Sequence, residues 1–129
     1  MFFNIDPSNG LAIYEQVARQ IKFAIAGEAL RPGEMIPSVR ELARELTINP
    51  NTVARALRSL QDEGVLETIR GQGLAVTPSA PEHCRQQRVH LIRDRLQQVL
   101  LEAKQSRLEI QQLRALVEQE LAAVENHKE

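Results

Sequence analysis

Four side chains that can recognise DNA bases cluster around Pro50: Asn49, Asn51, Thr52 and Arg55. Arginine can bind guanine through two hydrogen bonds, asparagine can bind adenine in the same way, and threonine can contact the methyl group of thymine. This combination suits the major groove of duplex DNA. It can act there only if the segment forms a helix that keeps these side chains out of the protein interior.

The surrounding sequence predicts such a helix. Asn49 is a favourable N-cap, and Pro50 takes the first helical position, where its missing N–H costs no hydrogen bond. The residues at helical spacing that would face a core are Val53, Ala56, Leu57 and Leu60. The polar side chains around Pro50 would therefore point outward, and Gly64 would end the helix.

A second helix is expected just before this one. Ser38-Val39-Arg40-Glu41 forms a capping box, in which Ser38 and Glu41 each accept a hydrogen bond from the other's backbone N–H. Its apolar positions are Val39, Leu42, Ala43 and Leu46. Only Thr47-Ile48 separates the two helices, so they cannot pack antiparallel and must cross at a steep angle, as in a helix-turn-helix.

Further elements flank this pair. An amphipathic helix is expected over about 11–26, with Gly27 as its C-terminal cap, and we assign its Tyr14 to helix packing. A loop then leads to the capping box, with a short strand at Met35-Ile36.

A β-hairpin follows, with strands over 65–70 and 74–77. Its tip is Gly71-Gln72-Gly73, because glycine adopts positive φ without strain. The hairpin would form a wing from which Arg70 enters a minor groove and Gln72 contacts a phosphate or a base edge. The predicted fold is mainly α with a small β-hairpin wing: a winged helix-turn-helix head plus a C-terminal helical dimerisation tail.

Composition excludes several classes of protein. The 129 residues carry 16 Lys and Arg against 17 Asp and Glu, so a DNA-binding role must rest on where the charges lie. Aromatic residues make up only 3%, which argues against a single-strand binder that stacks bases. No run reaches the roughly 18 apolar residues of a membrane span, and we expect a cytoplasmic protein without membrane contact.

No set of residues suggests catalysis or a metal site. His83-Cys84 is the one pair that invites a metal interpretation, but no other Cys exists and no His stands at a ligand spacing. We therefore predict no metal, no cofactor and no enzymatic activity, and we expect the Cys84 thiol to be exposed.

The segment Pro78-Ser79-Ala80-Pro81 predicts a domain boundary. It divides a DNA-binding domain over 1–77 from a tail over 82–129, with 78–81 as the linker. Ser106-Arg107-Leu108-Glu109 is a second capping-box pattern, which favours two helices, about 82–104 and 107–125, over one long rod.

The tail has more apolar surface than one small domain can cover. Heptad-like spacing and additional leucines produce a wide apolar stripe, for which self-association is the simplest explanation. The predicted homodimer interface comprises Val89, Ile92, Leu96, Val99, Leu100, Ala103, Ile110, Leu113, Val117 and Leu121.

Several ordered motifs resemble the GntR family of winged helix-turn-helix regulators, and the YtrA subfamily in particular. The motifs are Ile13-Tyr14-Glu15-Gln16, Ile36-Pro37-Ser38-Val39-Arg40-Glu41-Leu42-Ala43, Ile48-Asn49-Pro50-Asn51-Thr52-Val53, Leu60-Gln61-Asp62-Glu63-Gly64 and Arg70-Gly71-Gln72-Gly73. The resemblance covers about residues 11–77. It implies a dimeric transcription factor, usually a repressor, and YtrA-type members are often linked to transporter operons.

The resemblance also implies positions of DNA contact. Arg40 would contact DNA at the start of the second helix, and we add Ser38 at the same helix end. Asn49, Asn51 and Thr52 would lie at the N-terminus of the recognition helix. The wing would comprise Arg70, Gly71, Gln72 and Gly73.

Three functions remain open at this point. The first is a regulator that binds a pseudo-palindromic double-stranded DNA operator as a homodimer, with an unidentified small-molecule effector as a further partner. The second is a winged-helix protein-interaction or scaffold module without sequence-specific DNA binding. The third is a truncated regulator whose catalytic or sensory part is missing.

Overall fold

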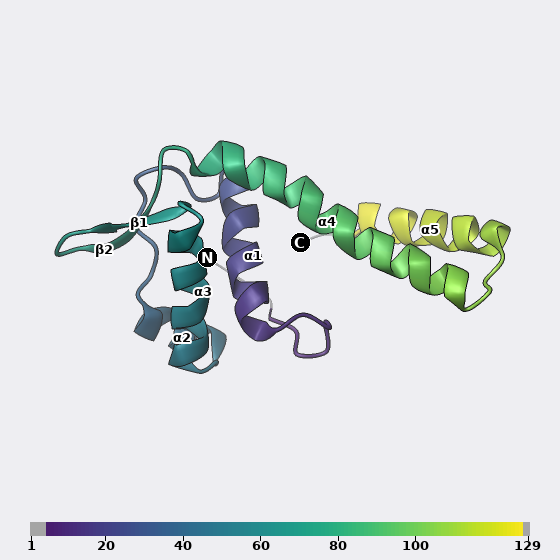
Figure 1. Ribbon diagram of the computed structural model, residues 1–129, viewed down its shortest axis with the longest axis horizontal. Coiled ribbons are helices and arrows are strands. Elements are labelled where there is room, and N and C mark those ends of the chain that lie inside the picture. The colour runs from purple at the N-terminus through teal and green to yellow at the C-terminus, as the bar shows by residue number, and fades with distance from the viewer. Residues whose placement is uncertain (1–4, 128–129) are drawn as a thin grey trace. The chain divides into compact units, whose positions relative to one another are not determined.

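The computed structural model describes residues 5–127 (Figure 1). Its elements are, in order, α1 (Ile13–Ala26), α2 (Val39–Leu46), α3 (Pro50–Asp62), β1 (Leu66–Ile69), β2 (Gly73–Val76), α4 (Ala80–Gln105) and α5 (Ile110–Glu125). These form two compact units, a head unit that extends to His90 and a tail unit that starts at Leu91. No helix of the described chain combines the length and apolar character needed to cross a membrane.

Three helices build the core of the head unit. α3 packs against both α1 and α2, and Figure 1 shows α1 and α3 side by side. The largest fully buried side chains of these helices are Val17, Ile21, Ile25, Leu42, Val53 and Leu60. The apolar faces predicted from helical spacing are therefore confirmed as the faces that meet in the core.

The turn between α2 and α3 follows the predicted capping chemistry. Ser38 Oγ accepts a hydrogen bond from the Glu41 N–H (3.1 Å), and Glu41 Oε1 accepts one from the Ser38 N–H (3.2 Å). The bond from the Ser38 backbone lowers the pKa of the Glu41 carboxyl. Asn49 Oδ1 caps α3 by accepting from the Asn51 N–H (2.8 Å), with Pro50 in the first turn. Thr47 adopts left-handed backbone geometry between them (φ 56°).

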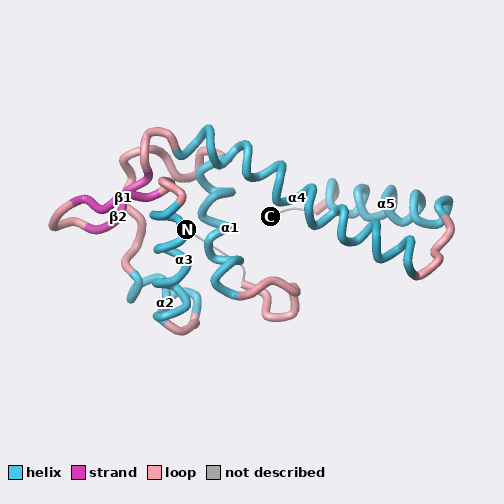
Figure 2. The backbone as a smooth tube through the Cα atoms, viewed as in Figure 1, coloured by secondary structure: helices cyan, strands magenta, loops and turns pink. Residues whose placement is uncertain are grey.

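The hairpin is shorter than predicted. β1 and β2 are antiparallel, with Leu66 opposite Val76 and Ile69 opposite Gly73, so Gly73 belongs to a strand rather than to the tip (Figure 2). The turn is formed by Arg70, Gly71 and Gln72. The strand expected at Met35-Ile36 is reduced to one isolated bridge between Met35 and Ala75.

α4 begins two residues before the predicted helix, and this start changes the interpretation of Cys84. Ala80 and Cys84 are buried in the head unit, so the expectation of an exposed thiol is wrong. Burial raises the pKa of the Cys84 thiol to about 11. Because only the thiolate is strongly nucleophilic, this cysteine is a packing residue.

The tail is divided into two helices, as predicted, but the connection between them differs from the predicted capping box. The Arg107 N–H donates to Lys104 O (3.0 Å) and the Leu108 N–H donates to Ala103 O (3.1 Å), with Arg107 at φ 63°. This pattern is a Schellman motif. The predicted capping box at Ser106 is wrong, because Ser106 Oγ bonds back to Ala103 O and α5 starts after Glu109 without a side-chain cap.

A small ion-pair cluster joins three helices of the head unit. The Glu63 carboxylate, at the C-terminal end of α3, accepts from Lys22 Nζ of α1 (2.6 Å) and lies 3.0 Å from His83 Nε2 of α4. Partial burial alone would raise the pKa of Glu63, but the bonds from Lys22 and His83 outweigh it and lower the pKa below its ordinary value of 4.5.

This cluster predicts a specific pH dependence of stability. Because the pKa of Glu63 is depressed in the folded state, its contribution to stability is present above pH 4.5 and is lost as the pH falls through the folded-state pKa. We expect Glu63→Gln to lower the free energy of unfolding at pH 7 by about 1–2 kcal/mol. The difference from the native protein should shrink toward low pH, as measured by urea unfolding.

The matched control is Glu67→Gln, which removes an exposed carboxylate from β1. It should change the unfolding free energy by less than about 0.5 kcal/mol at every pH. Equal effects of the two substitutions would show that the cluster adds nothing to stability.

Candidate nucleic-acid interface

α3 separates its side chains cleanly into a buried and a polar side. Val53, Ala56 and Leu60 have no exposed surface, whereas Asn51 and Arg55 are exposed and Thr52 is half-buried. This separation follows from the 3.6-residue period, because the apolar residues can reach the core only if the polar ones turn away from it. The N-terminal turns of α3 thus present amide, hydroxyl and guanidinium groups to solvent.

Two of the predicted site residues are also the N-caps of helices. Asn49 and Ser38 use their side-chain oxygens to cap α3 and α2. Both remain exposed, so the Asn49 amide NH₂ and the Ser38 hydroxyl hydrogen are still available as donors. Asn49 and Ser38 can donate a hydrogen bond to a ligand only in the side-chain orientation that capping imposes.

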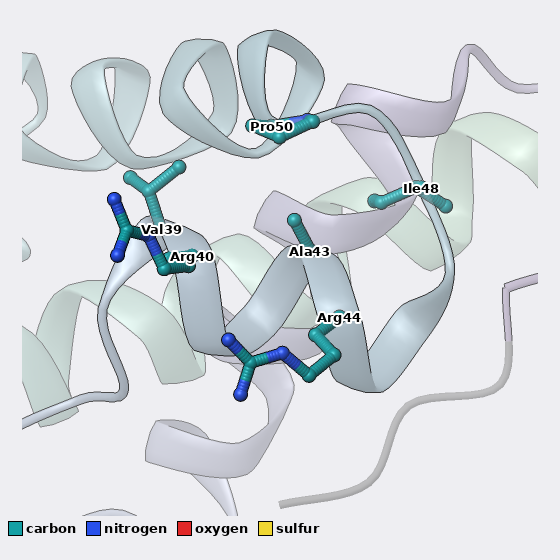
Figure 3. A pocket seen from close by; sticks show the side chains of 6 residues that line it. All are labelled: Val39, Arg40, Ala43, Arg44, Ile48 and Pro50. Carbon is teal, nitrogen blue, oxygen red and sulfur yellow. The ribbon is translucent and has the colours of Figure 1, made fainter.

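Two arginines of α2 lie beside the start of α3. Figure 3 shows Arg40 and Arg44 extending from α2, with Ile48 on the turn and Pro50 at the first turn of α3. These residues line an open hollow of about 650 Å³ together with Val39 and Ala43. Within residues 5–127 neither guanidinium forms an ion pair, so both can bind an external anion such as a phosphate.

Arg44 was not among the site residues predicted from sequence. The signal that could have identified it is its position four residues after Arg40, because residues at i and i+4 lie on the same face of a helix.

A second hollow lies between α1 and the polar side of α3. It has a volume of about 360 Å³ and is lined by Ile13, Tyr14, Asn51, Thr52 and Arg55. The Arg55 Cζ atom stands 3.7 Å from the centroid of the Tyr14 ring. Tyr14 also packs against the core, as predicted, but its contact with Arg55 was not foreseen.

The wing presents its tip to solvent. Arg70, Gly71, Gln72 and Gly73 are all exposed, and the hairpin extends away from the three helices of the head unit (Figure 1). Gly71 has φ 79°, and the Gln72 N–H closes the turn on Ile69 O at 2.9 Å. Within residues 5–127 the Arg70 guanidinium forms no ion pair, so the exposed turn carries a positive charge that suits a DNA groove.

The tail unit carries a different kind of surface. Large apolar side chains of α4 and α5 are exposed, with fractions that reach 57% at Val99 in α4 and 70% at Val124 in α5. The predicted interface residues are exposed or half-buried: Val89, Ile92, Leu96, Val99, Leu100, Ala103, Ile110, Leu113, Val117 and Leu121. Exposed large apolar side chains in this number are typical of a protein–protein interface.

Within the tail unit, α4 and α5 leave two shallow hollows between them. Their volumes are about 450 and 480 Å³, and both are lined by Leu100, Ile110 and Leu113. Across the described residues, no three His, Cys, Asp or Glu side chains are grouped to hold a metal ion.

Comparisons with known proteins match this arrangement. The family model of bacterial regulatory proteins of the gntR family matches residues 13–76. The chain is 34% identical over 124 residues to the HTH-type transcriptional repressor YtrA of Bacillus subtilis. This alignment covers 96% of this chain and 95% of the Bacillus protein.

Two solved structures extend the match to three dimensions. A GntR family transcriptional regulator from Listeria monocytogenes has a TM-score of 0.65 and 26% identity, covering 87% of this chain and 97% of the other. The DNA-binding domain of AraR in complex with operator ORX1 has a TM-score of 0.51 and 26% identity. The match covers 60% of this chain and 93% of the AraR chain.

The exposed wing generates a testable prediction. We expect Arg70→Ala to weaken binding to duplex DNA by about threefold to tenfold, because one guanidinium–phosphate or minor-groove contact is lost. The slope of log affinity against log salt should fall by about one, as measured by fluorescence anisotropy. Arg88→Ala, which removes the same charge from an exposed position on α4, should leave both quantities unchanged. Equal losses in the two variants would contradict a specific role for the wing.

Proposed function

Because this chain belongs to the GntR family of bacterial regulatory proteins, in which it is YtrA-like, we propose that it represses transcription by binding a pseudo-palindromic operator as a homodimer. The members of this family are DNA-binding transcription regulators and not enzymes. The observation that carries the proposal is the exposed polar side of α3, opposite a side whose residues are fully buried.

The proposed recognition places α3 in the major groove. Asn49, Asn51, Thr52 and Arg55 would contact base edges there, because their donors and acceptors complement those of adenine and guanine. Ser38 at the N-cap of α2 and the α2 residues Arg40 and Arg44 would hold the adjacent phosphates and fix the register of α3. In the AraR complex a related domain is bound to an operator, which supports this use of the head unit.

The wing would supply the second groove contact. Arg70 would enter the minor groove, while Gly71, Gln72 and Gly73 would approach the sugar–phosphate backbone closely. A guanidinium is favoured in a narrow minor groove, where the negative potential of the phosphates is concentrated. The domain that we assign to DNA binding is residues 1–77.

Dimerisation through residues 82–129 would join two such domains. One head unit makes a limited number of contacts, so two heads on half-sites about one helical turn apart gain affinity through their linkage. The exposed apolar side chains of α4 and α5 support a second copy of this chain as the occupant of that surface.

Occupation of the operator would exclude RNA polymerase by steric hindrance. A protein that acts on chromosomal DNA would work in the cytoplasm. The regulated unit would be a transporter operon, as the resemblance to the YtrA subfamily implies. An unidentified small-molecule effector would be a further partner of the dimer.

The direct test of this function is selection of bound fragments from random duplexes, followed by affinity measurements across a salt series. We expect one enriched inverted repeat, and a log affinity that falls linearly and steeply with log salt as phosphate contacts release counterions. No enriched sequence and a flat salt response would contradict the proposal and favour a protein-interaction module.

A separate prediction concerns the dimer. We expect the double substitution Leu96→Glu with Val99→Glu to weaken self-association by more than about 100-fold, because charges buried at an apolar interface lose their hydration. Light scattering after size exclusion measures the mass directly. The control is Gln97→Glu with Gln98→Glu, which adds the same charge at neighbouring exposed positions. A Leu96/Val99 variant that remains dimeric would place the interface elsewhere.

A further inference from the structure

The contact between Tyr14 and Arg55 joins the first helix to the polar side of the recognition helix. The Arg55 Cζ atom lies over the Tyr14 ring, 3.7 Å from its centroid. This distance is well within the roughly 6 Å over which a guanidinium is attracted to the face of an aromatic ring. The contact belongs to none of the packing that buries the core, because Arg55 itself is exposed.

We propose that Tyr14 is a positioning residue for base recognition, which holds the Arg55 guanidinium where α3 meets the major groove. The inference rests on the proposed function, since it assigns a role within the same interface. Tyr14 would act through Arg55 and would not itself select a base.

The geometry leaves the arginine free to bind. Stacking on a ring uses the flat face of the guanidinium, whereas its N–H donors point outward in the plane of the group. Arg55 can therefore remain on Tyr14 while its edge donates two hydrogen bonds to guanine O6 and N7. Arg55 lines an open hollow together with Tyr14, Asn51 and Thr52, so there is space beside it for a base.

The ring is a firm support for this purpose. Tyr14 lies on α1 and packs against the buried cluster of the head unit, one turn before Val17, which is completely buried. α1 and α3 are in direct contact. Motion of the ring is therefore restricted by the core, and the ring restricts Arg55 in turn.

Restricting Arg55 before binding should improve affinity and selectivity together. A free arginine side chain loses much of its rotational freedom when it is fixed on a base, and this loss reduces the affinity. A side chain already held near its bound position loses less. The benefit applies only where the bound geometry matches, so it should be larger for the preferred base than for others.

A double-mutant cycle with Tyr14→Leu and Arg55→Ala tests the inference. Leucine retains apolar bulk against the core but cannot stack on a guanidinium. On the selected operator, we expect Tyr14→Leu to weaken binding about threefold to tenfold in the Arg55 protein and by less than twofold in the Arg55→Ala protein. Tyr14→Leu should also reduce the affinity ratio between the operator and a duplex with the Arg55-contacted base pair exchanged.

Two controls separate positioning from general damage. Tyr14→Phe keeps the ring and should bind like the native protein. Phe23→Leu alters another half-buried aromatic residue of α1 and should leave base preference unchanged. Thermal unfolding of every variant checks that the head unit is folded.

The outcomes distinguish this inference from the proposed function. If the native protein binds no duplex selectively, the proposed function fails. If the native protein binds its operator but the effects of Tyr14→Leu and Arg55→Ala are additive, Tyr14 is structural only and the inference is overturned. An increase in affinity on Tyr14→Leu would also overturn it, because the ring would then be holding Arg55 away from DNA.

Discussion

The interface depends on how α3 is held in the core. Its apolar side is enclosed between α1 and α2, with Val53, Ala56 and Leu60 completely buried, and this packing determines which side of the helix remains in solvent. Rotating α3 about its axis would expose those residues and bury Asn51 and Arg55. The loss of apolar burial would be several kcal/mol, so the orientation of the polar side is a consequence of the core.

The elements around α3 reinforce this orientation from both ends. At the N-terminal end, the side-chain oxygens of Ser38 and Asn49 accept hydrogen bonds from backbone N–H groups and so fix the starts of α2 and α3. At the C-terminal end, Glu63 connects α3 to Lys22 of α1 and His83 of α4. The recognition helix is thus fixed at its start by hydrogen bonds and at its end by ion pairs, while its outer face is free.

The elements that can be predicted from the sequence are those with local determinants. The capping box at Ser38, the Asn49-Pro50 helix start and the division of the tail into two helices were predicted from short patterns, and the structure confirms them. The Ser106 box failed because its four-residue pattern competes with a Schellman motif that ends α4. Burial of Cys84 and stacking of Arg55 on Tyr14 join residues distant in sequence, and no local pattern encodes them.

The most direct test of the central claim is a backbone-amide NMR titration of the protein with its selected operator duplex. The orientation of α3 predicts the largest shifts at residues 49 and 51–55, at 38–40 and at 70–72, with small changes at the buried positions of α1. Large shifts confined to other segments, with the amides of 49 and 51–55 unchanged at saturation, would contradict the claim that the polar side of α3 faces the DNA.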